Sequence, residues 1–92
     1  DVRPYIAGAR VFVVPLRAGG GTRLKILTAW SMASAVVTTS IGCEGLDAID
    51  GVNCLIRDDP EDFADAVVRV SQDADLRRAL GAAARVTAER TY

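Results

Sequence analysis

The residues best suited to bind a ligand form a short glycine-rich segment with basic side chains on both sides. Glycines let an anionic group approach the backbone closely, and a helix that begins just after them offers free N–H groups. The segment could therefore hold a diphosphate or sugar hydroxyls. The alternative is an exposed loop with solvated arginines, and both interpretations stay open on the residue types alone. Its members are Arg17, Gly19, Gly20, Gly21, Thr22, Arg23 and Lys25.

Several other kinds of site are excluded or disfavoured. Leu24 stands where Gly-x-Gly-x-x-Gly requires its third glycine, and no Gly-Lys-Ser/Thr follows the loop. The chain has no histidine, so it cannot build a Ser-His-Asp triad. Two cysteines, Cys43 and Cys54, are too few for a disulfide scaffold or a zinc site. We expect plain thiols in a cytoplasmic protein, with Cys54 buried in a strand, and neither a metal nor a cofactor.

The elements around the glycines read as a strand, a loop, a helix and a second strand. The apolar run from Ala9 to Leu16 is short and β-branched, which predicts a strand buried on both faces. Thr22 could cap a helix from Arg23 to about Ala33, with Trp30 in the core. The run from Ala35 to Thr39 predicts the second strand. This order within about 30 residues is a βαβ unit.

The rest of the chain continues the alternation. Ser40 to Gly51 reads as a loop with one helical turn over Leu46–Ile49, and Asn53 to Ile56 as a third strand. Asp59 before Pro60 is a strong helix start, and a last helix begins near Asp73. The predicted fold is therefore α/β: a Rossmann-like partial domain with about three parallel strands and helices on both faces.

The length and charge of the chain limit the number of domains and the kinds of partner it can have. Ninety-two residues make a single domain, taken here as residues 1–92. A net charge of −1 disfavours a nucleic-acid partner bound by bulk charge, and no apolar run is long enough for a membrane span. The chain opens without methionine and in mid-pattern, so we expect it to be part of a longer protein.

Three segments in order resemble the donor-binding, C-terminal domain of GT-B glycosyltransferases of the family-four kind (glycosyl transferases group 1). The first contains Pro-Leu-Arg-Ala-Gly-Gly-Gly-Thr-Arg-Leu-Lys, the second Ile-Gly-Cys-Glu-Gly-Leu, and the third Asp-Gly-Val-Asn-Cys-Leu-Ile. The resemblance covers nearly the whole chain. The segments are Pro15 to Met32, Ser34 to Leu46 and Asp50 to Ala64.

The resemblance implies that the loop and the following helix lie over the sugar and diphosphate of a nucleotide-sugar donor. Gly19, Gly20, Gly21 and Thr22 correspond to the donor cradle. The family's helix acid, which accepts hydrogen bonds from the ribose hydroxyls, corresponds to Thr28. That is the main departure, because one hydroxyl cannot replace a carboxylate there. A second departure lies at Met32-Ala33-Ser34, where the family has a glycine turn and a left-handed residue would cost about 1 kcal/mol.

The sequence therefore predicts the nucleotide-sugar-binding part of a glycosyltransferase that transfers a hexosyl group to an acceptor. Because GT-B chemistry needs an N-terminal acceptor domain, we expect the 92 residues alone to be inactive and donor binding to be weak or lost. The alternative is a non-catalytic α/β interaction module, a self-associating remnant of such an enzyme. An open sheet edge would favour a homodimer.

Overall fold

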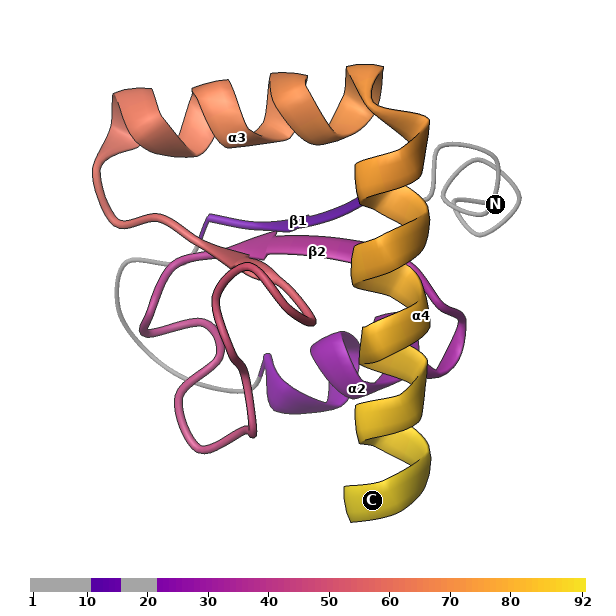
Figure 1. The fold of residues 1–92 in the computed structure, drawn as a ribbon. Coiled ribbons are helices and arrows are strands. Elements are labelled where there is room, and N and C mark those ends of the chain that lie inside the picture. The colour runs from indigo at the N-terminus through magenta and orange to yellow at the C-terminus, as the bar shows by residue number, and fades with distance from the viewer. Residues whose placement is uncertain (1–10, 16–21) are drawn as a thin grey trace, which may run out of the picture.

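The computed structural model describes residues 11–15 and 22–92, and these residues form three strands and three helices (Figure 1). The strands are short and the last helix is the longest element. In chain order the elements are β1 (Val11–Val14), α2 (Arg23–Ser31), β2 (Ala35–Thr38), β3 (Leu55–Ile56), α3 (Pro60–Gln72) and α4 (Ala74–Thr91).

The three strands form one parallel sheet in the order β1-β2-β3. Val11 pairs with Ala35, and Val37 pairs with Leu55. Helix α2 covers one face of the sheet and α3 covers the other, while α4 runs past the side of both (Figure 1). The predicted α/β architecture, with three parallel strands and helices on both faces, is confirmed.

The prediction that the first strand is buried on both faces is wrong for β1. This strand is the outer one of the described sheet, and Val13 is 40% exposed. The central strand β2 is buried at all four positions instead, because α2 and α3 cover its two faces. Strand β2 ends at Thr38, one residue earlier than expected.

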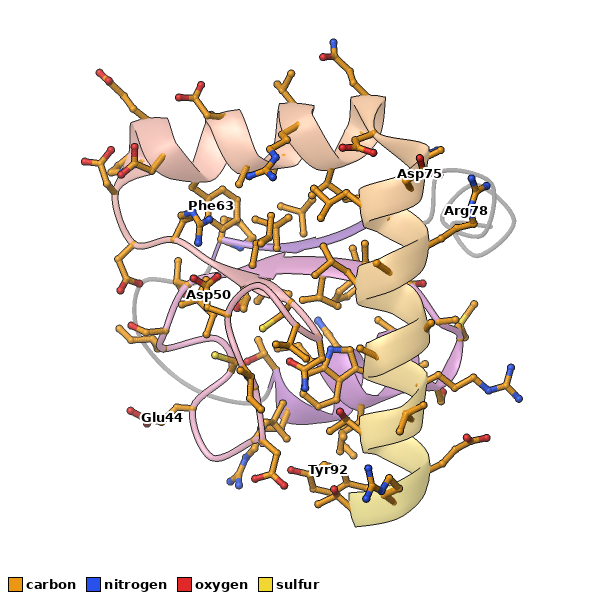
Figure 2. All side chains as sticks on the ribbon, viewed as in Figure 1. Glu44, Asp50, Phe63, Asp75, Arg78 and Tyr92 are labelled. Atoms are coloured by element: carbon orange, nitrogen blue, oxygen red, sulfur yellow. The ribbon has the colours of Figure 1, made fainter. Side chains whose placement is uncertain are left out.

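Successive side chains of β2 point to opposite faces of the sheet, so the core is divided into two apolar clusters. Val36 packs with Trp30 of α2 and with Ala84 and Ala88 of α4. Val37 faces the other way, toward a cluster that includes Phe63 of α3 (Figure 2). Trp30 is fully buried, so its predicted place in the core is confirmed, although its Nε1 has no hydrogen-bond partner among the described residues.

The turn that ends α2 has a left-handed residue where the sequence predicts one. Ala33 has φ 58°. Its N–H donates to the Trp30 carbonyl at 3.0 Å, and the Ser34 N–H donates to the Ala29 carbonyl at 3.0 Å. These two bonds define a Schellman motif, in which glycine normally takes the place of Ala33. The helix therefore ends at Ser31, slightly before the expected Ala33.

The connection from β2 to β3 is less regular than expected. Residues 46–49 are not helical, because the side chain of the buried Asn53 forms hydrogen bonds with backbone groups of this segment. Its Oδ1 accepts from the Ile49 N–H at 2.9 Å, and its Nδ2 donates to the Asp47 carbonyl at 2.9 Å and to Thr87 Oγ1 of α4 at 3.1 Å. The third strand is accordingly shorter than predicted. Cys54 is buried but forms only an isolated bridge with Asp50 before β3 begins.

The helix starts predicted at Asp59 and Asp73 are both confirmed. The Asp59 carboxylate accepts from the N–H groups of Glu61 at 3.0 Å and Asp62 at 3.1 Å. The Asp73 carboxylate accepts from the Leu76 N–H at 3.0 Å. Both aspartates satisfy helix N–H groups that would otherwise lack an intrahelical partner.

Candidate ligand-binding site

The candidate site lies at the carboxyl edge of the sheet, where parallel strands deliver their following loops. Ligands of open α/β sheets bind at this edge. Here the loop after β2, residues 39–46, meets the amino end of α2. The segment after β3 leads from the same edge into α3.

Thr22 ties the amino end of α2 to that loop. It occupies the N-cap position, but its side chain does not cap the helix, so the predicted capping role is wrong. Its hydroxyl donates instead to the Gly42 carbonyl at 2.8 Å. The hydroxyl therefore does not occupy the first-turn N–H groups of α2.

Gly42 explains why the loop comes so close to the strands. A Cβ at this position would collide with Thr38 Oγ1 and would lie 2.9 Å from Val14 Cγ1. The Gly42 N–H also donates to Thr39 Oγ1 at 3.2 Å. Only glycine allows this close approach to the ends of β1 and β2.

Arg23 extends from the first turn of α2 across the same loop. A Cβ built on Gly45 would lie 3.0 Å from the Arg23 Nη1 and 3.5 Å from its Cζ. Arg23 is exposed and forms no ion pair with any residue in 11–15 or 22–92. Arg23 thus places its guanidinium beside this loop, close to the first turn of α2.

Lys25 and Thr28 are also exposed, but they lie on another side of α2. They are three residues apart and share a helix face, whereas Thr28 is about 140° around the helix axis from Arg23. The Thr28 hydroxyl donates to the Leu24 carbonyl at 2.8 Å, so it offers only its lone pairs to a ligand. The predicted site residues therefore divide into two groups, Thr22 with Arg23 and Lys25 with Thr28. Gly19, Gly20 and Gly21 lie outside the described residues.

A second link joins the ends of β2 and β3. The Ser40 N–H donates to an Asp58 carboxylate oxygen at 2.8 Å, and the Ser40 hydroxyl contacts both carboxylate oxygens at 3.0 and 2.9 Å. Glu44 is exposed and points away from the loop (Figure 2). Asp58 thus links the segments that follow β2 and β3, whereas Glu44 points outward.

The residues that sequence reasoning missed are Ser40, Gly42, Gly45 and Asp58. Ser40 and Asp58 each stand two residues after the end of a strand, and Gly42 and Gly45 lie farther along the loop after β2. A signal was present, because residues just after parallel strands gather at the carboxyl edge of the sheet. From the sequence alone, Gly42 and Gly45 indicate only a loop.

The two thiols are not suited to nucleophilic chemistry. Burial raises the pKa of Cys43, and the negative charge of Asp58 raises it further. Burial, with the neighbouring charges of Cys43 and Asp50, raises the pKa of Cys54 to about 12. Within the described part of the chain, no group of three His, Cys, Asp or Glu side chains could hold a metal ion.

Residues 1–73 match the model of the family described as glycosyl transferases group 1. The chain belongs to this family. The match takes in the glycine-rich segment, α2, the whole sheet and α3, and it ends at the residue that caps α4. Neither a curated protein nor a solved structure matches this group 1 glycosyl transferase chain. None of its described helices is long and apolar enough to cross a membrane.

Proposed function

We propose that this group 1 glycosyl transferase chain binds the diphosphate of a nucleotide-sugar donor at the carboxyl edge of its sheet. The observation that carries the proposal is the joint placement of Thr22 and Arg23. The Thr22 hydroxyl donates to the Gly42 carbonyl and accepts no hydrogen bond from its own helix, and Arg23 lies against Gly45. An uncapped helix end and a guanidinium together suit an anion. Gly19, Gly20 and Gly21 complete the proposed cradle.

Thr28 has a lesser part in the same proposal. It would accept a hydrogen bond from a ribose hydroxyl where the family resemblance puts a carboxylate. Its single oxygen and its bond to Leu24 limit that contact. Donor binding is therefore expected to be weak, with a dissociation constant near the millimolar range.

Sugar transfer is proposed to need the acceptor-binding domain that GT-B chemistry requires. The 92 residues have no histidine to serve as a general base. We therefore expect no hexosyl transfer and no donor hydrolysis above background from this chain alone. Turnover of a nucleotide-sugar by the purified chain would contradict this part. A cytoplasmic location also stays a prediction, supported by the free thiols of Cys43 and Cys54.

Titration with UDP, GDP and their sugars, followed by NMR or calorimetry, tests the donor site. Arg23→Ala should weaken binding by roughly 3- to 10-fold, a modest loss because Arg23 is exposed and solvent screens its charge. Thr28→Glu should strengthen it, because a carboxylate can accept from both ribose hydroxyls. Arg85→Ala on α4 is the control, since Arg85 is exposed and its ion pair within the described residues is with Glu89 of the same helix at 3.4 Å. The absence of binding by the folded chain at millimolar nucleotide would refute the proposal.

The second candidate is a self-associating interaction module. Strand β1 is outermost in the described sheet, with Val13 partly exposed. The opposite edge is closed, because Asp50 accepts from the Ile56 N–H at 2.9 Å and Arg57 donates to the Ile56 carbonyl at 2.7 Å. A homodimer would therefore form through β1. Light scattering over a range of micromolar concentrations tests it, and a strict monomer would contradict it.

A further inference from the structure

We infer that Gly45 is a positioning residue for the donor, because the absence of its side chain lets Arg23 lie where a diphosphate can reach it. The inference rests on the proposed function and names a residue that the sequence interpretation did not include. Gly45 does not touch the ligand in this proposal. It acts through the guanidinium of Arg23.

The outer part of the Arg23 side chain lies against Gly45. A Cβ on Gly45 would lie 3.0 Å from Nη1, 3.5 Å from Cδ and 3.5 Å from Cζ of Arg23. Gly45 also has φ +87°, a conformation that residues with a side chain rarely adopt. A methyl group there would therefore strain the backbone and would also press against the guanidinium.

The loop that carries Gly45 has little freedom to withdraw. On one side Gly42 accepts from Thr22 and donates to Thr39. On the other side the Leu46 N–H donates to the carbonyl of the buried Cys43 at 3.0 Å. Arg23 is exposed, and several rotatable bonds separate its guanidinium from the backbone. A methyl group on Gly45 would therefore displace the guanidinium rather than the loop.

Gly51 supplies a matched control for this substitution. Its φ is nearly the same, +81°, but no atom of residues 11–15 or 22–92 lies within 4 Å of a Cβ built on it. Gly45→Ala and Gly51→Ala therefore carry similar backbone strain, and only the first disturbs Arg23. Both should lower the melting temperature by similar amounts. Only Gly45→Ala should weaken the binding of UDP, GDP and pyrophosphate, by roughly 3- to 10-fold.

A double-mutant cycle separates positioning from a general effect on the loop. In the Arg23→Ala background the guanidinium is gone, so Gly45→Ala should cause no further loss of affinity. Equal losses in both backgrounds would refute the inference, since Gly45 would then act without Arg23. Equal affinities of wild type and Gly45→Ala would also refute it. If the folded wild-type chain binds none of the three probes, the proposed function fails as well.

Discussion

Ala33 offers the most direct test of how this chain ends α2. The residue has φ 58°, and its N–H donates to Trp30 in a Schellman motif. A left-handed conformation costs a residue with a Cβ about 1–2 kcal/mol relative to glycine. Because glycine has more conformational freedom in the unfolded chain, the substitution also lowers the free energy of unfolding by about 0.4–1 kcal/mol. The middle of these two ranges gives a net stabilisation of about 0.5–1 kcal/mol for Ala33→Gly.

The effect is large enough to measure. For a domain of this size it corresponds to a rise in Tm of roughly 2–8 °C. Thermal and urea unfolding followed by circular dichroism would record it, with an unchanged m-value because the fold does not change. Measurements at several protein concentrations would show whether association contributes to the shift.

Ala82→Gly is the matched control for this substitution. Ala82 is exposed inside α4, where its backbone is helical. The same chemical change should there destabilise the protein by about 1 kcal/mol, because glycine is a poor helix former. Opposite signs for the two variants are expected. A loss of stability in Ala33→Gly would refute the assignment of strain to this turn.

Three further predictions concern packing, pH and thiol reactivity. Gly81→Ala should lower stability by about 1–3 kcal/mol in urea unfolding, because its Cβ would collide with the Ala33 carbonyl oxygen and lie 2.9 Å from the carbonyl carbon. Burial alone would raise the pKa of Asp50, but hydrogen bonds from Ile56 and Arg57, with the Arg57 charge, hold that pKa below its ordinary value of 3.8. The stability that Asp50 contributes is thus present above its ordinary pKa and lost as pH falls through the folded-state pKa. The free energy of unfolding of Asp50→Asn, measured at a series of acid pH values, should therefore depend less on pH than that of the wild type. Cys54, with a pKa near 12, should resist iodoacetamide in the native chain at about pH 8 and react after urea unfolding, as read by mass spectrometry.

Local patterns along the chain were sufficient to predict the three strands, the three helices and the family, but they wrongly predicted a helical turn over residues 46–49. The β-branched runs predicted β1 and β2, and Asp59 before Pro60 predicted the start of α3. The apolar stripe that contains Trp30 predicted a core helix, and the missing glycine after Met32 predicted the strain that Ala33 shows. Each of these signals acts over a few residues, so neighbouring side chains and backbone geometry determine the outcome.

Only the tertiary structure decided how the candidate site is assembled. Thr22 has the right residue type for a helix cap, but its hydroxyl donates to a carbonyl twenty residues away. Arg23 lies over Gly45, and Thr28 lies on another side of the same helix. The exposure of β1 likewise depends on its place in the sheet. These features follow from how strand ends and loops that are distant in sequence pack together, and no propensity of a single segment specifies that arrangement.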